Sequence, residues 1–281
     1  MRKITANMIE KFRKYLLNEE KSAVTVEKYI RDVKSFKKWV DGREIVKAEM
    51  LLYKEHLIEL YAPASVNSIL SSLNSFFGFN EWYDLRVKNV KVQRQMFVSA
   101  DKELNKSEYE RLLRAAKNKK NEKLYLIMQT ICSTGIRVSE LKFITVESVK
   151  SGQAQVKLKG KVRTVFLPDE LIKLLKRYVG EQEIESGRVF VTRTGQPIDR
   201  HGIWKAMKEL CESAGVKKEK VFPHNLRHLF ARTYYSIQKD MARLADILGH
   251  SNVNTTRIYT IETGEIHRRQ IQRLGLVCML V

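Results

Sequence analysis

The chain has 281 residues, 43% of them hydrophobic, which is enough for two domains of ordinary size and argues against wholesale disorder. The 52 lysines and arginines outnumber 32 aspartates and glutamates, and the net charge of +20 favours a polyanionic partner such as nucleic acid. An anionic membrane is the competing partner, but no apolar run approaches the ~20 residues that span a bilayer, and the basic amino terminus lacks the apolar core of a signal peptide.

The amino-terminal part of the chain, residues 1–90, is predicted to be all-helical. In TVEKYIRDVKSFKKWV the apolar residues recur at helical spacing, and Ser22 or Thr25 is a suitable N-cap. A second helix is expected after Pro63, through ASVNSILSSLNSFFGF, with apolar residues on one face and Ser and Asn on the other. Those small polar side chains either face solvent or contact phosphates, and the sequence favours neither reading.

Helical periodicity ends before residue 91. The stretch VKNVKVQRQMFVSADKELNK holds no sustained period and is basic. We predict that residues 91–105 form a linker between two domains, and its charge suits a segment lying along a phosphate backbone.

The carboxyl-terminal part, residues 106–281, mixes helices and strands. AQVKLK and VRTVFL alternate like two strands joined by a tight turn around Gly160, and Gly135 is a natural helix stop. Helices are expected at 106–118, 121–134, 169–180, 199–214, 224–236, 240–248 and 252–260, and the strands at 154–159 and 162–167. The predicted fold is therefore mainly α with a small antiparallel β-sheet, a helical amino-terminal domain preceding a mixed α/β domain.

The three cysteines, Cys132, Cys211 and Cys278, are odd in number, widely spaced and without a CxxC pair. This spacing predicts neither a disulfide framework nor a thiolate zinc site, and apolar packing is the expected role of each. A reducing cytoplasm is the predicted location.

Several short motifs of the second part carry residues suited to phosphate chemistry. STGIRVSEL places Arg137 just beyond a helix end, and PHNLRH places His224 and Arg227 three apart, on one helix face. LGHSNVNTTRIYT contains His250 and, nine positions later, Tyr259. Taken alone, each residue has an ordinary reading, and a lone tyrosine is usually a packing residue.

Together these motifs resemble the tyrosine recombinase (phage integrase) family. TVEKYIRDVKSFKKWV and SVNSILSSLNSFF resemble the core-binding helices of that family. The carboxyl half resembles its catalytic domain, with the motifs in the same order, and GIRVSEL matches the family pattern G-[LI]-R-x-[ST]-E-L. The resemblance covers nearly the whole chain.

The resemblance implies a role for each motif residue. Tyr259 is expected to be the nucleophile, and Arg137 and Arg227 to bind the scissile phosphate. His224 would be the histidine of the HxxR motif and His250 the histidine of the third motif.

Two further positions are implied by the same resemblance. The hairpin lysine would be the mobile general acid, which falls on Lys159, with Lys161 as an alternative. Glu140 matches a carboxylate position that supports the site.

The reaction explains these residue types. Attack on a phosphodiester builds negative charge on its oxygens, and arginine stays charged and binds phosphate oxygens bidentately. A phenol of pKa ~10 needs help to lose its proton, and the leaving 5′ oxygen needs a proton. No metal, ATP or other cofactor is expected, because the arginines supply the positive charge that a metal would otherwise bring.

A zinc site is the rival reading of the histidines. His224 and His228 have the i, i+4 spacing of a zinc-binding helix, but Asn225 replaces the glutamate of HExxH and Arg227 would repel a cation. His228 is then expected to support the site or pack in the core.

The predicted function is site-specific DNA recombination, as integration and excision of a mobile element or as chromosome-dimer resolution, through a 3′-phosphotyrosine. The expected partners are double-stranded DNA with core recombination sites and three further copies of the chain, as a homo-tetramer on two duplexes. The tail GLVCMLV either passes to a neighbouring protomer or packs on its own. The alternatives are a type IB topoisomerase and a catalytically inactive DNA-binding regulator.

Overall fold

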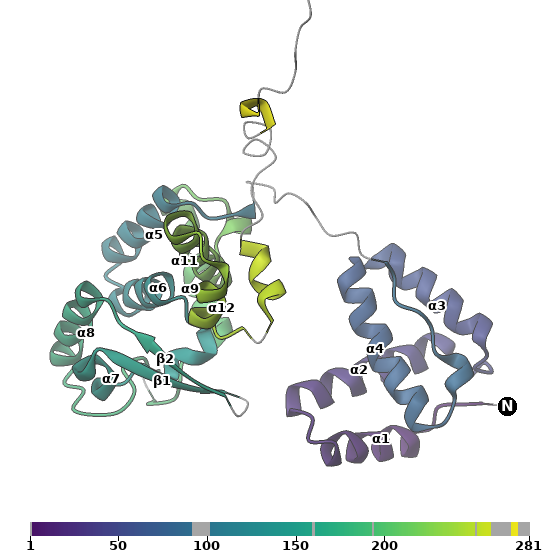
Figure 1. The fold of residues 1–281 in the computed structure, drawn as a ribbon. Coiled ribbons are helices and arrows are strands. Elements are labelled where there is room, and N and C mark those ends of the chain that lie inside the picture. Colours follow the sequence, from purple (N-terminus) through teal and green to yellow (C-terminus); the bar gives the residue numbers. More distant parts are fainter. Residues whose placement is uncertain are drawn as a thin grey trace, which may run out of the picture. The chain divides into compact units, whose positions relative to one another are not determined.

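The computed structural model describes residues 2–91, 102–158, 161–192, 194–250, 252–259 and 271–274. The chain divides into two compact units, Met1–Arg94 and Gln95–Val281. The regular elements described in the first unit are helices, and the second combines helices with a two-stranded antiparallel sheet (Figure 1). The predicted fold class, mainly α with a small antiparallel sheet, is confirmed. Most of the predicted linker 91–105 lies outside the described residues, and this linker stays a prediction.

Local capping sets where the helices of the first unit begin. The Thr5 side chain accepts a hydrogen bond from the backbone N–H of Met8, and Ser22, one of the two predicted N-caps, accepts one from Thr25. Pro63 stands at the first turn of its helix, where a missing N–H costs nothing. The helices are α1 (Ala6–Asn18), α2 (Ala23–Val40), α3 (Lys47–Leu60), α4 (Pro63–Phe79) and the short 3₁₀ helix η1 (Tyr83–Leu85).

Aromatic residues fill the core of the first unit. Phe12 of α1 meets Phe76 of α4 edge to face at 5.2 Å between ring centroids. A buried polar contact joins α2 to α4, because Ser72 donates to the Asp32 carboxylate at 2.8 Å and Lys28 lies 2.7 Å from the same oxygen. Pairing of this kind is what permits a carboxylate to be buried.

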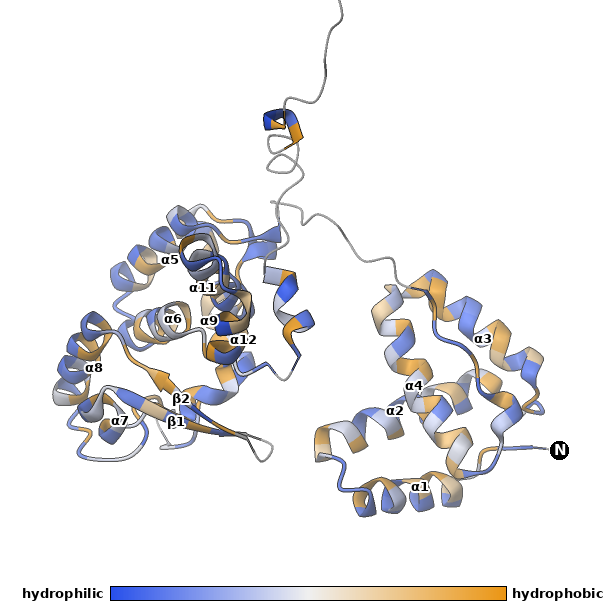
Figure 2. Cartoon of the chain, in the orientation of Figure 1, coloured by the Kyte–Doolittle hydropathy of each residue, from blue (hydrophilic) through white to orange (hydrophobic). Residues whose placement is uncertain are grey.

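The second unit is built around α6, which lies among α5, α8, α9 and α11 (Figure 1). Helix α6 buries residues on several sides, whereas hydrophilic residues cover much of the visible surface of α5 and α8 (Figure 2). The elements are α5 (Lys106–Asn118), α6 (Glu122–Thr134), η3 (Val138–Phe143), α7 (Val146–Ser151), β1 (Gln153–Leu158), β2 (Lys161–Phe166), α8 (Asp169–Glu181), α9 (Arg200–Lys208), α10 (Cys211–Ala214), η4 (Lys218–Lys220), α11 (Pro223–Gln238), α12 (Met241–Leu248) and η5 (Val253–Tyr259).

The structure corrects two predicted helices. The expected helix 199–214 is two helices, α9 and α10, because the chain turns between them and buries Leu210 in the core. The segment expected as a helix over 252–260 is the 3₁₀ helix η5. The Asn252 side chain accepts from the backbone N–H of Asn254, the kind of local bond that competes with α-helix formation.

The hairpin strands begin and end one residue earlier than predicted. Gln153 pairs with Phe166 and Leu158 with Lys161 in an antiparallel register. Lys159 and Gly160 lie outside the described residues, as does the side chain of Lys161. The assignment of the hairpin lysine therefore stays a prediction.

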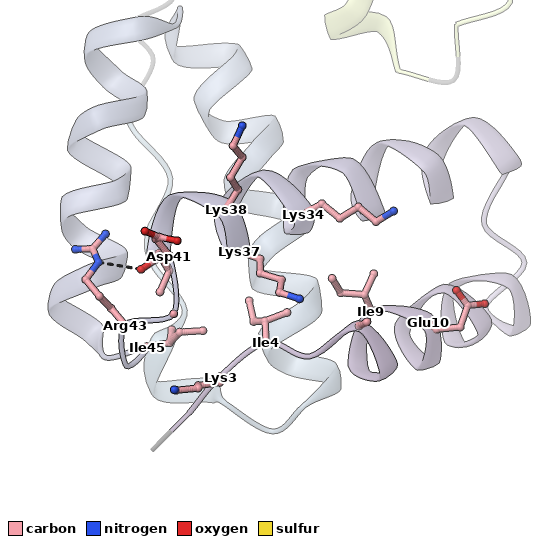
Figure 3. Close-up of a pocket in the computed structure, with 13 residues that line it drawn as sticks. Lys3, Ile4, Ile9, Glu10, Lys34, Lys37, Lys38, Asp41, Arg43 and Ile45 are labelled. Carbon is pink, nitrogen blue, oxygen red and sulfur yellow. Dashed lines mark hydrogen bonds between the residues drawn. The ribbon is translucent and has the colours of Figure 1, made fainter.

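Helices α1 and α2 border an open hollow of about 670 Å³ in the first unit. Ile4, Ile9 and Ile45 line it together with lysines, and Lys34 and Lys37 extend from α2 (Figure 3). None of the predicted catalytic residues lines this hollow. Among the helices in the described ranges, none has the length and apolar character required to cross a bilayer.

Candidate active site

Side chains from separate segments of the second unit meet at the amino-terminal half of α11. Arg137 comes from the loop after α6, and His224 and Arg227 lie on α11. His250 follows α12, and Tyr259 ends η5, the yellow-green segment that packs beside α11 and α12 (Figure 1). The structure thus gathers five of the six residues to which the sequence assigned catalytic roles, and the sixth, Lys159, lies outside the described residues.

Arg137 is placed by the end of α6. That helix stops at Gly135 with φ +66°, and a Cβ there would lie 2.4 Å from the Phe230 ring, so that only glycine fits. Arg137 then occupies the N-cap of η3, where its backbone N–H donates to Glu140 at 2.8 Å. Its guanidinium donates to the same carboxylate at 3.0 Å and remains 39% exposed, open to an incoming anion.

Arg227 is held from two sides and only 1% exposed. It donates to the carbonyl of Gly135 at 2.5 Å and to that of Leu248 at 2.8 Å. Its Nε N–H is buried with no hydrogen-bond partner among the described residues, a donor that a phosphate oxygen can satisfy. Burial, and next to it the charge of Arg137, lowers the pKa of Arg227.

His250 is oriented through both ring nitrogens. Nε2 lies 3.0 Å from Nη2 of Arg227, and Nδ1 lies 2.9 Å from the hydroxyl of buried Thr256. Arginine can only donate, so we assign Nε2 as the acceptor and Nδ1–H as the donor to Thr256. Burial, with the charges of Arg227 and Arg137, lowers the pKa of His250 to about 4, which makes the ring neutral at neutral pH.

Tyr259 lies within the site of its own chain and is 3% exposed. Its ring stacks on His250, with centroids 5.8 Å apart and planes 14° apart, and meets His228 edge to face at 4.6 Å. The interaction with Tyr259 raises the pKa of Arg227 and so opposes the burial that lowers it. The phenol is therefore next to the buried guanidinium, although Tyr259 follows His250 by nine positions in the sequence.

The two histidines of α11 pack edge to face at 4.6 Å. Burial lowers the pKa of both, with Arg227 contributing at His224 and His224 contributing at His228, whose pKa falls to about 4. No three potential metal ligands gather around them within the described residues. His228 thus lies between His224 and Tyr259, the supporting position that the sequence suggested as one possibility.

Sequence reasoning missed several residues of the site. Thr256 orients His250, and Arg200, the first residue of α9, is close enough to lower the pKa of His224. Arg163 of β2 was also missed, although it binds Glu140 at 2.6 Å. The sequence did contain a signal that Arg163 faces inward, because strand alternation places it on the same face as buried Val165.

The arrangement can bind and polarise a phosphodiester. Arg137 and Arg163 pair with one buried carboxylate, Glu140, and Arg227 is close enough for that charge to raise its pKa, so that the site keeps an excess of fixed positive charge. Such preorganised cations stabilise the negative charge of a phosphoryl transition state. The phenol of Tyr259, beside Arg227, is the available nucleophile of the cluster.

Comparisons with known proteins give one consistent result. Residues 102–265 match the phage integrase family, and residues 9–83 match the phage integrase N-terminal SAM-like domain. The chain is 30% identical to tyrosine recombinase XerA of Thermococcus kodakarensis over 281 residues, covering 96% of both chains.

Two solved structures show the same fold. The XerH site-specific recombinase bound to its difH substrate is 21% identical, with a TM-score of 0.70 over 92% of this chain and 82% of that chain. A lambda integrase tetramer bound to a Holliday junction is 19% identical, with a TM-score of 0.68 over 90% of this chain and 76% of the integrase.

Proposed function

Since this chain belongs to the phage integrase family and is a tyrosine-type site-specific recombinase, we propose that it cleaves and rejoins DNA through a covalent 3′-phosphotyrosine. The observation that carries the proposal is the position of Tyr259, held between His250 and His228 beside the guanidinium of Arg227. A binding protein has no need of a phenol at this place.

In the proposed reaction the scissile phosphate lies against Arg137 and Arg227. The exposed guanidinium of Arg137 and the unpaired Nε N–H of Arg227 donate to its oxygens. Tyr259 attacks phosphorus, its proton passes to His224, and the P–O5′ bond breaks. His224 is suited to receive that proton, because its lowered pKa makes it neutral at neutral pH.

The leaving 5′ oxygen takes a proton from the hairpin lysine, which we assign to Lys159, with Lys161 as the alternative. The phosphotyrosine ester conserves the energy of the broken bond. The 5′ hydroxyl of another strand can therefore reverse the step without ATP. The arginines supply the charge that the transition state requires, so that the proposed steps need no metal ion.

The proposed substrate is double-stranded DNA carrying core sites, bound by a homo-tetramer on two duplexes. The net charge of +20 supports a DNA partner, and the lysines along the hollow of the first unit offer further phosphate contacts. In this proposal the tail 275–281, which lies outside the described residues, passes to a neighbouring protomer.

Strand exchange between two sites tests this function. Two labelled duplexes that carry the DNA flanking the gene should yield recombinant products with the wild-type protein and none with Tyr259→Phe. Relaxation of supercoiled DNA without recombinant products would indicate a topoisomerase. DNA retention without either product would indicate a regulator. The amino-terminal SAM-like match and the family relationship favour neither alternative.

A further inference from the structure

Arg163 of β2 lies at the edge of the site without reaching its open side. Its side chain is 15% exposed, and both of its terminal nitrogens donate hydrogen bonds within the protein. Nη2 donates to Glu140 at 2.6 Å, and Nη1 donates to the carbonyl of Ile247 at 2.5 Å. Arg163 is therefore bound to the site rather than free to bind a phosphate.

Glu140 gathers donors from two arginines. It is 1% exposed and accepts from the backbone and the guanidinium of Arg137, and from Arg163. A buried carboxylate is costly unless paired, and Arg163 adds to the pairing that the backbone and guanidinium of Arg137 provide by themselves. Arg163 is thus linked to the loop that carries Arg137.

The second contact links Arg163 to the segment before His250. Ile247 is near the end of α12, and Gly249 follows at φ +66°. A Cβ on Gly249 would lie 2.6 Å from Cδ of Arg163, so that the glycine leaves room for the arginine to pass.

Arg163 is also part of the hairpin. It pairs with Val156 in the middle of the two strands, four residues after Lys159. In the described part of the hairpin, it is the side chain with hydrogen bonds both to η3 and to the end of α12. The planar guanidinium of Arg163 therefore fixes the hairpin to Glu140 on one side and to the carbonyl of Ile247 on the other.

We propose that Arg163 is a positioning residue that holds the β1–β2 hairpin, and hence its lysine, in register with the scissile phosphate. This inference rests on the proposed function, in which the hairpin lysine protonates the leaving oxygen. In that step the phosphotyrosine bond forms, the P–O5′ bond breaks, and the lysine ammonium gives its proton to O5′. Loss of Arg163 should therefore weaken leaving-group protonation more than phosphate binding or attack.

A substrate with sulfur in place of the bridging 5′ oxygen distinguishes this role from a general structural one. A thiol has a pKa of ~8.5, so that its thiolate can leave without a proton. An alcohol has a pKa close to the ~15.7 of water, so that its oxygen needs a proton to leave. We expect Arg163→Ala to cleave ordinary DNA ~10–100-fold more slowly than wild type, the loss that follows when an orienting partner is removed elsewhere. On the sulfur substrate its rate should approach that of wild type.

Two companion variants control for the fold. Arg163→Lys keeps a positive charge beside Glu140 but cannot reach both partners, so that it should show the same sulfur-selective rescue with an intact fold. Thr164→Ala alters the next residue, whose exposed side chain pairs with Gln155, and should cleave both substrates like wild type. Equal slowing of the arginine variants on both substrates, or no slowing on either, would overturn the inference.

Lys159→Ala and Lys161→Ala in the same assay separate the inference from the proposed function. If sulfur rescues one lysine variant but not the arginine variants, Arg163 does not position that lysine, and the function stands. If sulfur rescues neither lysine variant, the lysine mechanism fails and the role of Arg163 fails with it. Formation of the covalent DNA adduct at Tyr259 is measured separately and tests the proposed function by itself.

Discussion

Nε2 of His250 lies 3.0 Å from Nη2 of Arg227, and the other nitrogen of the same ring lies 2.9 Å from the hydroxyl of Thr256. Because arginine has no acceptor, this contact selects one tautomer of the neutral ring. Tyr259 stacks on that ring. One group of contacts therefore fixes the tautomer of His250 and holds the guanidinium of Arg227 and the ring of Tyr259 beside it.

The tautomer can be tested at Thr256. Thr256→Val should keep the shape of the buried side chain but remove the acceptor of Nδ1–H, leaving the ring without its orienting partner. We expect DNA cleavage to slow, with DNA affinity unchanged. Thr256→Ser, which restores the hydroxyl, should recover most of the rate. A Thr256→Val protein as fast as wild type would show that Thr256 does not orient His250.

The two phosphate-binding arginines should differ in their effect on stability. Arg137→Ala and Arg227→Ala should each slow cleavage by ~10²–10³-fold, as loss of one donor to a developing oxyanion does elsewhere. Arg227→Ala should also lower the free energy of unfolding more than Arg137→Ala does, because the carbonyls of Gly135 and Leu248 lose buried donors, at ~1–3 kcal/mol for each unsatisfied group. When Arg137 is lost, the buried Glu140 still keeps Arg163 as a partner. Urea unfolding of both variants checks this, and equal losses of stability would contradict it.

Acidification should destabilise the free protein through its buried histidines. The pKa of His228 falls from 6.5 to about 4, chiefly by burial, and that of His250 falls equally far for the same main reason. Between these values the unfolded chain binds protons that the folded chain does not. The stabilisation that comes from these neutral histidines is fully present above pH 6.5 and is lost as the pH falls towards 4.

Urea unfolding at about pH 7 and about pH 5.5, on either side of the usual histidine pKa, measures this effect. His228→Gln removes one titrating group, so that its unfolding free energy should fall less between these two conditions than that of wild type. An unchanged difference would mean that His228 does not contribute to the pH dependence.

Gly135 offers a test of how the helix end places Arg137. Gly135→Ala combines a positive φ with a Cβ 2.4 Å from Phe230, whereas Gly187→Ala has a positive φ and nothing within 4 Å of its Cβ. Both should lose stability to backbone strain, at ~1–3 kcal/mol. Gly135→Ala should lose a further ~1–3 kcal/mol to overpacking and should also cleave more slowly. Equal melting temperatures for the two variants would contradict this account.

The helices and the family pattern could be predicted because they depend on local features. Ser22, Pro63 and Gly135 mark helix ends by their own chemistry. The break at Leu210 could not be predicted, because it depends on burial in a core formed by distant helices. Arg163 was missed for a related reason, since its partners Glu140 and Ile247 lie 23 and 84 positions away.

The central claim is that Tyr259 forms a covalent ester with DNA. The most direct measurement incubates wild type and Tyr259→Phe, in EDTA, with nicked duplexes that carry the DNA flanking the gene, and separates the products on a denaturing gel. The account predicts a slower, protease-sensitive DNA band for wild type alone, with equal DNA retention by both proteins under native conditions. A band of the same strength from Tyr259→Phe, or none from a wild-type protein that recombines the same sites, would contradict it.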